Sequence, residues 1–395
     1  MMIELKPLPL PASADASKFT QFGREVFGVD PANLTNEQFG EIREALYKAR
    51  THHDVLVFRN AALTPKQQYA LTKAFDPASE KGGHKEHTKK SLLGPYIPIP
   101  SVPQVQLTGN GTVYNHEGIE EAKLKHRSHK TFHKTIVSPE DEAAGATRFY
   151  RWDIDAALYE ISPVRVTTLY GLRVPAGPRK VCRYDDGTGD ELPVPLAATA
   201  FVSGKTMFAL LPMQLKSLAV RARVKYAPHP WVWMTPAHTK STGLGMESEG
   251  LEVAYSELPA WREEKRNILP MVWKTPTTGE LSFQVHGCGA AEIFIDPLPA
   301  DTEPKEALYP DGTHLMDLEE VRELLYKMQR PAIAPPFVYP HDWHENDLIL
   351  FNNGGVMQSV VGELGPDQIR IFHQCNLAGS DAPAGQSAED VRKWE

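Results

Sequence analysis

Cysteine is scarce in this sequence of 395 residues, and a membrane-length apolar run is missing from it. The three cysteines, at positions 182, 288 and 375, are not spaced as a metal-binding or redox pair. An odd, sparse set fits a reducing compartment better than a disulfide scaffold, so we interpret all three as packing residues. No run approaches the roughly 18 apolar residues of a membrane span, and the N-terminal residues do not resemble a signal peptide. We expect a cytoplasmic protein without a membrane partner.

The glycine-rich and nucleophile motifs of several enzyme classes are also missing. No GxGxxG motif follows an expected strand and no GKS or GKT occurs, so a nucleotide-phosphate site is not indicated. A GxSxG nucleophile elbow is missing too. The formal net charge of -8 argues against a nucleic-acid partner. The basic run 123–134 could contact an anion, but a solvated loop is the more common interpretation of such a run. A small molecule is the expected partner.

The first third of the chain predicts a helical start followed by loops. Residues 34–76 are expected to form a helix, a strand and a second helix. Thr35 with Gln38 forms a capping-box pattern, and Thr64 before Pro65 repeats it. Residues 79–135 are polar, basic and rich in glycine, and they predict irregular loops that cover a pocket.

Strand signals dominate from residue 148 to residue 376. Short apolar or alternating segments are separated by turns, a pattern typical of an antiparallel barrel or a jelly roll. One helix is expected over 317–330, because four apolar residues there keep helical spacing. We predict a single domain over residues 1–378, followed by a flexible tail over 379–395.

Two aspartates stand out at 153 and 155, within the segment RFYRWDIDAALY. Side chains at i and i+2 of a strand project from one face. That face is either exposed to solvent or directed into a cavity, and the flanking apolar residues favour the cavity. Two carboxylates in one low-dielectric site repel each other, so one of them gains proton affinity. Such a pair is suited to general acid and base chemistry.

Arg370 lies in the alternating segment QIRIFHQCN at 368–376. An arginine on such a strand is either a surface residue or a bidentate clamp for a carboxylate. The alternation alone leaves both interpretations open.

Taken together, these segments resemble the TauD/TfdA superfamily, and most closely its fungal xanthine dioxygenases. The matching stretches are TRFYRWDIDAALY at 147–159, RYDDG at 183–187, YAPHPWVWM at 226–234, ILPMVWK at 268–274, and KMQRPAI, VYPHDW, DLILF and GGV between 327 and 356. The resemblance runs from about residue 34 to residue 376. It implies a mainly β fold with flanking helices around a double-stranded β-helix, or jelly-roll, core that normally holds iron(II) and 2-oxoglutarate.

The resemblance also implies an altered metal site. The family binds iron through a His-x-Asp motif and a distant histidine, a facial triad of two histidines and one carboxylate. The matching positions are Asp153, Asp155 and Gln358, so only Asp155 keeps the family identity. An all-oxygen set suits magnesium, manganese or calcium better than iron. From these positions we expect no metal and no cofactor, and iron(II) with 2-oxoglutarate only under an alternative interpretation.

The positions expected around the co-substrate and the substrate are changed unevenly. A threonine of the family pattern is Val181 here, one arginine is Gly354 and another is His373, whereas Arg370 is kept. The substrate positions remain polar, and Gln358 could also contact a substrate. The matching residues are Gln104, Gln106, Lys125, Asp141 and Asn376.

Three functions follow from this pattern. The first is a metal-independent, redox-neutral enzyme of fungal secondary metabolism that catalyses a cyclisation, isomerisation, dehydration or bond cleavage. In it Asp153, Asp155, Lys125 or His373 would transfer protons, and Arg370 would hold a carboxylate or oxyanion. The second is an iron(II)/2-oxoglutarate dioxygenase with an altered Asp/Asp/Gln site. The third is a non-catalytic protein that binds a ligand. The expected ligand is a polar heterocycle or a carboxylate.

Overall fold

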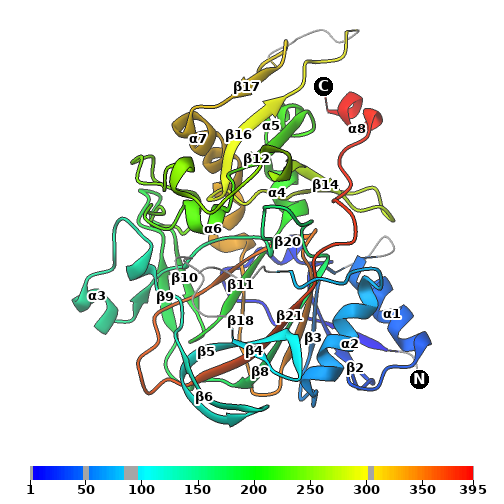
Figure 1. The fold of residues 1–395 in the computed structure, drawn as a ribbon, viewed down its shortest axis with the longest axis vertical. Coiled ribbons are helices and arrows are strands. Elements are labelled where there is room, and N and C mark those ends of the chain that lie inside the picture. The colour runs from blue at the N-terminus through cyan, green and yellow to red at the C-terminus, as the bar shows by residue number, and fades with distance from the viewer. Residues whose placement is uncertain (1–2, 48–52, 84–96, 301–306, 395) are drawn as a thin grey trace.

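Two facing β-sheets form the centre of the fold in the computed structural model, which describes residues 3–47, 53–83, 97–300 and 307–394 (Figure 1). The larger sheet has nine strands in the order β1-β2-β3-β19-β8-β21-β5-β4, with β6 paired to β5. The smaller sheet has the order β18-β11-β20. This is the mainly β, jelly-roll architecture with flanking helices that the family resemblance implies.

The larger sheet is antiparallel except where β2 runs parallel to β3. Its strands are β1 (Glu4–Pro7), β2 (Arg24–Phe27), β3 (Val55–Phe58), β4 (Ile97–Ile99), β5 (Val102–His116), β6 (Ile119–Leu124), β8 (Val166–Arg173), β19 (Leu348–Asn352) and β21 (Arg370–Asn376). The smaller sheet contains β11 (Thr199–Ser203), β18 (Tyr339–His341) and β20 (Val356–Val360). One cluster of buried side chains lies between the sheets, with Val57, Leu169 and Phe372 from the larger sheet and Phe201 and Val356 from the smaller one.

Helices α1 (Asn36–Tyr47) and α2 (Pro65–Phe75) cover the outer face of the larger sheet. Ile42 and Leu71 pack there against Leu56 and Leu350. The side chain of Thr64 accepts a hydrogen bond from the backbone of Gln67, so the capping box forms as the sequence predicts. These contacts hold β3 and β19 against the two helices.

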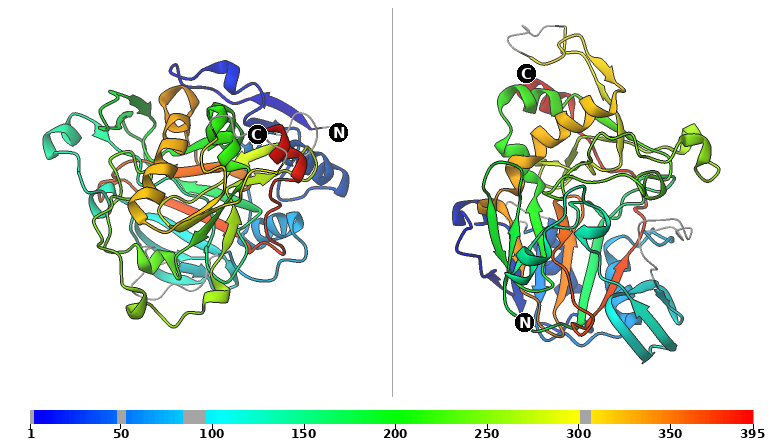
Figure 2. Two further views of the ribbon diagram at one scale, coloured as in Figure 1. Left: turned by 90° about the horizontal axis from the view of Figure 1, so that it is seen from above. Right: turned by 90° about the vertical axis from the view of Figure 1, so that its left-hand side faces the viewer.

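A layer of helices and short strands is inserted between β11 and β18 and forms the upper part of the molecule in Figure 1 and in the right view of Figure 2. Its helices are α4 (Gly204–Leu210), α5 (Met213–Ala219), α6 (Pro230–Trp233) and α7 (Leu318–Gln329). Its strands are β12 (Ala222–Tyr226), β13 (Ile268–Pro270), β14 (Val272–Lys274), β15 (Leu281–Phe283), β16 (Ala290–Ile295) and β17 (Thr313–Leu315). The largest cluster of buried side chains joins this layer to the jelly roll. None of the helices in the described ranges combines the length and apolar character needed to cross a bilayer.

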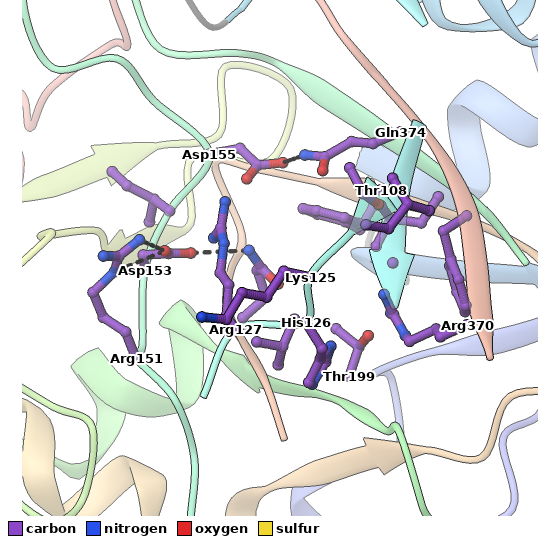
Figure 3. A pocket seen from close by; sticks show the side chains of 18 of the residues that line it. Thr108, Lys125, His126, Arg127, Arg151, Asp153, Asp155, Thr199, Arg370 and Gln374 are labelled. Atoms are coloured by element: carbon purple, nitrogen blue, oxygen red, sulfur yellow. Dashed lines mark hydrogen bonds and ion pairs between the residues drawn. The ribbon is translucent and has the colours of Figure 1, made fainter. Parts of the chain in front are cut away.

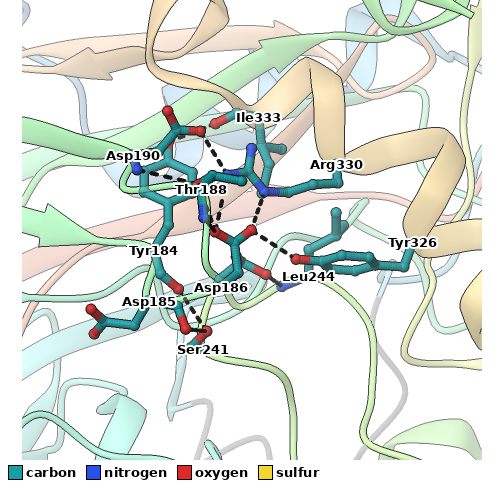
Figure 4. A network of polar contacts seen from close by, with 11 residues as sticks. Tyr184, Asp185, Asp186, Thr188, Asp190, Ser241, Leu244, Tyr326, Arg330 and Ile333 are labelled. Atoms are coloured by element: carbon teal, nitrogen blue, oxygen red, sulfur yellow. Dashed lines mark hydrogen bonds and ion pairs between the residues drawn. The ribbon is translucent and has the colours of Figure 1, made fainter.

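Two of the family stretches meet in a polar network that joins α7 to the turn between β9 (Lys180–Arg183) and β10 (Glu191–Val194) (Figure 4). The guanidinium of Arg330 donates to Asp186 at 2.5 Å and to Asp190 at 2.6 Å. Hydrogen bonds from this guanidinium hold the pKa of the Asp186 carboxyl below its usual value despite partial burial. The RYDDG and KMQRPAI stretches therefore serve the fold, at a distance from the pocket described below.

The prediction of irregular loops over 79–135 is wrong for much of that range. Strand β5 spans 15 residues and pairs with β21 inside the larger sheet, and β5 and β6 form a hairpin. Glycines and polar residues alternate there with buried Val105 and Leu107, because only one face of the strand packs on the core. The remaining short elements are β7 (Ala146–Thr147), in a three-stranded sheet with β9 and β10, and α3 (Pro139–Ala143). Residues 84–96 lie outside the described residues.

The prediction of a flexible tail over 379–395 is also wrong. Helix α8 (Ala388–Lys393) begins with a capping box between Ser387 and Asp390. Lys274 donates to Asp390 at 2.6 Å, and the ring of Trp394 packs edge-on against Phe208 at 5.5 Å between centroids. The segment is rich in small polar residues, and this composition gave no sign that Trp394 packs on Phe208 of α4.

Replacing Asp390 with alanine should release α8. The change removes the acceptor of Lys274 and half of the capping box, a loss of about 1–2 kcal/mol in local stability. We expect hydrogen exchange of the amides at 388–393 to speed up by roughly 5- to 30-fold. Glu389→Gln, an exposed neighbour on the same helix, is the control and should leave these rates unchanged; equal rates in both variants would contradict the docked helix.

Candidate active-site pocket

A cavity of about 110 Å³ opens between the two sheets of the jelly roll (Figure 3). Its walls come from the extended segment at 151–155, the end of β6 with the residues after it, and inward-facing residues of β21 and β20. The lining is polar and charged, with Lys125, Arg127, Arg151, Asp153, Asp155, Gln358, Arg370 and Gln374 among its members. Aromatic groups of Trp231, Phe351 and Phe372 complete it.

Asp153 and Gln358 lie side by side at one end of the cavity. Their backbones form an antiparallel bridge, with both amide-to-carbonyl distances at 2.9 Å. The side-chain amide of Gln358 also donates to Oδ1 of Asp153 at 2.9 Å. Strand β20 thus places residues 153 and 358, which the sequence resemblance predicts at two of the family's metal-ligand positions, in direct contact.

Asp155 lies two residues further along the same extended segment. Its Oδ2 accepts a hydrogen bond from the hydroxyl of Thr167 at 2.6 Å, and Asn353 bonds to its backbone on both sides at 2.7 and 2.8 Å. Burial raises the pKa of both the Asp155 and the Asp153 carboxyls. Two carboxylates with raised pKa in one pocket are suited to hold either a cation or a proton.

Arg151 supplies the counter-charge to Asp153. Its guanidinium donates to Oδ2 of Asp153 at 3.0 and 3.2 Å, and its side chain is fully buried. The guanidinium lies over the ring of Trp231 at 4.4 Å and near Tyr150 and Phe132. These cation–π contacts fix the guanidinium of Arg151 and therefore the direction of the Asp153 carboxylate.

The opposite end of the cavity is cationic. Arg370 is buried, its Nε has no hydrogen-bond partner among the described residues, and its guanidinium lies 3.6 Å from the centroid of Phe372. Burial, together with the nearby charge of Arg127, lowers the pKa of Arg370 to about 9. Figure 3 shows Arg370 on the far side of the cavity from Arg151 and Asp153. The cavity therefore has a carboxylate end and a guanidinium end, which suits a ligand with an anionic group at the Arg370 side.

Most of the residues singled out in the sequence meet here. Asp153, Asp155, Lys125, Gln358 and Arg370 all line the cavity. Three other expected residues lie beside it on the same face of the larger sheet. Gln106 is opposite Gln374 in the pairing of β5 with β21. Gln104 lies two residues before Gln106 on β5 and so shares its face. Asn376 hydrogen-bonds to the Asp155 carboxylate.

His373 and Asp141 are not in the lining. Along β21 the side chains of Arg370, Phe372 and Gln374 face the cavity, so His373 projects to the other face, where its Nε2 lies 2.7 Å from Nε2 of His116. Asp141 is on α3 and pairs with Arg183 at 2.9 Å. The assignment of His373 as a proton-transfer residue and of Asp141 as a substrate contact is therefore corrected.

Several pocket residues were not identified from the sequence. Arg151 precedes Asp153 by two positions, so the same i, i+2 spacing that selected the aspartates also places it on their face. His126 and Arg127 belong to the basic run that we interpreted as a solvated loop, and the structure directs them into the cavity. Nothing in the residues around Trp231 indicated a place in the pocket, because α6 is far along the chain from the other lining residues and only the fold brings it there.

The sequence model of the taurine catabolism dioxygenase TauD, TfdA family matches residues 9–357. The chain belongs to the TauD/TfdA family. It is 46% identical over 382 residues, 96% of this chain and 97% of the relative, to the alpha-ketoglutarate-dependent xanthine dioxygenase xanA of Emericella nidulans. It is also 46% identical to the alpha-ketoglutarate-dependent xanthine dioxygenase xan1 of Schizosaccharomyces pombe, over 98% of this chain and 91% of that protein.

Solved structures support the same fold at lower identity. The crystal structure of AAD-2 in complex with Mn(II) and N-oxalylglycine superposes with a TM-score of 0.55 and 17% identity, covering 97% of this chain and all of that one. A putative alpha-ketoglutarate-dependent taurine dioxygenase from Burkholderia xenovorans has a TM-score of 0.51 and 18% identity, covering 97% of this chain and 91% of that one.

The relatives overturn two expectations. A metal-independent, redox-neutral enzyme and the absence of cofactors are both wrong as predictions, because relatives with 46% identity over nearly the whole chain are alpha-ketoglutarate-dependent dioxygenases. An enzyme with a small-molecule substrate remains the supported conclusion.

Replacing Arg151 with methionine should strongly destabilise the protein. The change leaves the Asp153 carboxylate buried without its counter-charge, which typically costs about 3–5 kcal/mol. Urea unfolding at neutral pH measures the difference. Arg179→Met breaks an exposed pair with Asp342 instead and should cost at most about 1 kcal/mol. If the two variants lose the same stability, the pair does not serve as the counter-charge described here.

Proposed function

We propose that this protein is a 2-oxoglutarate-dependent dioxygenase of a polar, purine-like heterocycle, with its metal held by Asp153, Asp155 and Gln358. The observation that carries the proposal is the charge arrangement of the cavity, with buried carboxylates at one end and buried Arg370 at the other. The 46% identity to xanthine dioxygenases supports the reaction type and the substrate class. A role in fungal secondary metabolism and a cytoplasmic location stay predictions.

Arg370 fits a carboxylate of the co-substrate. Its buried Nε has no hydrogen-bond partner among the described residues, which is costly unless a ligand supplies an acceptor. A guanidinium can hold a carboxylate through two parallel hydrogen bonds. Because Arg127 adds a second positive charge nearby, the far carboxylate of 2-oxoglutarate suits this end of the cavity.

The metal positions fit a divalent ion with oxygen ligands. The carboxylates of Asp153 and Asp155 and the amide of Gln358 come from adjacent backbone segments, and a cation beside the two acids would favour their ionised forms. Iron(II), when bound with 2-oxoglutarate, supplies the oxygen chemistry of this family. Oxygen ligands hold iron(II) less tightly than imidazole does, so we expect this protein to need more iron than a site with histidines.

The remaining residues would position the substrate and exclude water. Gln104, Gln106 and Gln374 present amides on one face of the larger sheet, and each amide offers both donors and an acceptor. Such groups can pair with the alternating donors and acceptors of a purine edge. Phe351, Phe372 and Trp231 give the cavity apolar walls, and Arg151 holds Asp153 in place.

The test is oxygen consumption coupled to succinate formation, with xanthine and related purines at saturating iron(II). We expect succinate and consumed oxygen in equal amounts. The double variant Asp153→His with Gln358→His should lower the iron(II) concentration for half-maximal rate by at least about tenfold, because it restores the imidazole ligands.

Asp155→Ala is the negative control and should abolish turnover. If the wild type consumes no oxygen with any purine at saturating iron, the proposed activity is refuted. Purine binding without turnover would have the same consequence and would favour a non-catalytic ligand-binding protein. Because Asp153→His also removes the partner of buried Arg151, urea unfolding first checks that the double variant is as stable as the wild type. If it is as stable and needs as much iron, positions 153 and 358 do not hold the metal.

Affinity for 2-oxoglutarate should depend on pH through Arg370. Only the charged guanidinium attracts a carboxylate, and the pKa of Arg370 in the free protein is about 9. Affinity should therefore be constant up to about pH 8 and fall by up to about tenfold per pH unit above pH 9. Calorimetric titration with manganese in place of iron measures it. Arg370→Met should bind about 10- to 100-fold more weakly at pH 7 and show no such inflection.

A further inference from the structure

A second group of metal-binding side chains lies outside the cavity. Among the described residues, one set of three drawn from histidine, cysteine, aspartate and glutamate can bring ligand atoms within 4.8 Å of one another, namely His129, Glu142 and Glu363. His129 is in a short 3-10 helix (His129–Thr131), Glu142 is in α3, and Glu363 follows β20. The catalytic proposal uses none of the three.

The polar atoms of this group are incompletely paired. His129 is 1% exposed, and its Nδ1 has no hydrogen-bond partner among the described residues. Its Nε2 receives only a weak contact from the backbone N–H of Val137 at 3.5 Å. Oε1 of Glu142 is also buried and has no hydrogen-bond partner among the described residues. The ring nitrogen that faces Glu142 is Nε2, so the unsatisfied atom at this point is Oε1 of Glu142, a buried carboxylate oxygen that calls for a further partner.

The distance between these atoms matches a shared ion better than a hydrogen bond. Nε2 of His129 lies 3.7 Å from Oε1 of Glu142, beyond hydrogen-bond range. Two ligands of one tetrahedral zinc ion, each about 2.0–2.2 Å from the metal, lie roughly 3.3–3.5 Å apart. A shift of a few tenths of an ångström would therefore bring both atoms into a common coordination sphere.

We propose that His129, Glu142 and Glu363 form a second site for a divalent transition-metal ion of the zinc class. One imidazole and two carboxylates are a ligand set that zinc accepts, with a water in the fourth position. The site is distinct from the metal positions of the cavity and does not depend on the proposed function.

Two neighbouring side chains currently occupy part of the group. Nζ of Lys130 lies 2.7 Å from Oε2 of Glu142, and the hydroxyl of Ser128 hydrogen-bonds to Oε2 of Glu363. Lys130 uses the outer oxygen of Glu142 and is 40% exposed, so its ammonium group can move into solvent when an ion binds. Lys130 thus competes with the ion for Glu142. Removing its ammonium group should therefore leave zinc affinity unchanged or raise it, whereas removing a ligand should lower it.

The ion would connect α3 to two segments next to the cavity. His129 lies two residues after Arg127, which lines the cavity with Lys125 and His126, and Glu363 lies between β20 with Gln358 and β21 with Arg370. Binding would therefore hold one wall of the cavity against α3. We expect zinc to slow hydrogen exchange of residues 126–137.

The experiment is a zinc titration of the full-length, chelator-treated protein, read by calorimetry and by metal analysis after dialysis. Glu142→Gln should bind one zinc ion fewer than the wild type, or bind that ion at least about tenfold more weakly. Glu140→Gln, an exposed residue of the same helix, should match the wild type. Glu363→Gln should repeat the loss, which guards against a folding defect in one variant, and Lys130→Met should bind zinc as tightly as the wild type or more tightly.

The difference between variants separates this site from the cavity. Asp155→Asn would remove an ion from the cavity and leave the ion at His129 in place, and dioxygenase activity plays no part in the readout. Equal stoichiometry and affinity in Glu142→Gln and Glu140→Gln would overturn the proposal. The same holds if Lys130→Met loses the ion, because Lys130 would then support the site instead of competing for it.

Discussion

The buried ion pair between Arg151 and Asp153 is the interaction on which the pocket depends. A carboxylate inside a jelly roll loses its hydration, and a single nearby guanidinium restores part of the lost stabilisation. The guanidinium is itself held by aromatic faces, chiefly that of Trp231. The direction of Asp153, its bond to Gln358 and the shape of the cavity all follow from this fixed charge. Removing it would disturb the fold and the site together.

Backbone pairing gives the site its precision. The segment with residues 151, 153 and 155 belongs to no long strand, yet the bridge between Asp153 and Gln358 ties it to β20. Asn353, in the turn after β19, holds the backbone of Asp155 through both atoms of its side-chain amide. Strand β20 is in turn paired with β11. Side chains that are far apart in the sequence thus reach one cavity through main-chain hydrogen bonds.

Much of this arrangement could be predicted from the sequence, and the exceptions have physical reasons. The alternation of side chains along an extended segment correctly placed Asp153 and Asp155 on one face. The same rule could have excluded His373 from the cavity, because it lies three residues after Arg370 on β21 and therefore on the other face. Alternation failed for β5, because glycines and polar residues at a half-exposed hairpin look like a loop. Arg127 is one of several basic residues in a run after β6, and only the position of the β5–β6 hairpin determines that this run borders the cavity. The docking of α8 depends on Trp394 and a distant lysine, contacts that only the tertiary fold creates.

In the proposed metal site, the ligands would differ from the family pattern in charge as well as in donor atoms. The family pattern of two neutral imidazoles and one carboxylate around a divalent ion has a net charge of +1. Asp153, Asp155 and Gln358 around the same ion have a net charge of zero. A dianionic co-substrate would be attracted less by this centre, so more of its binding energy has to come from the other end of the cavity. The buried Arg370, with the charge of Arg127 close by, stands where that attraction is needed, and the low dielectric around it strengthens each interaction. Under the proposed function, a site with weaker attraction at the metal would therefore depend more on its arginines, and binding of the co-substrate would involve both ends of the cavity.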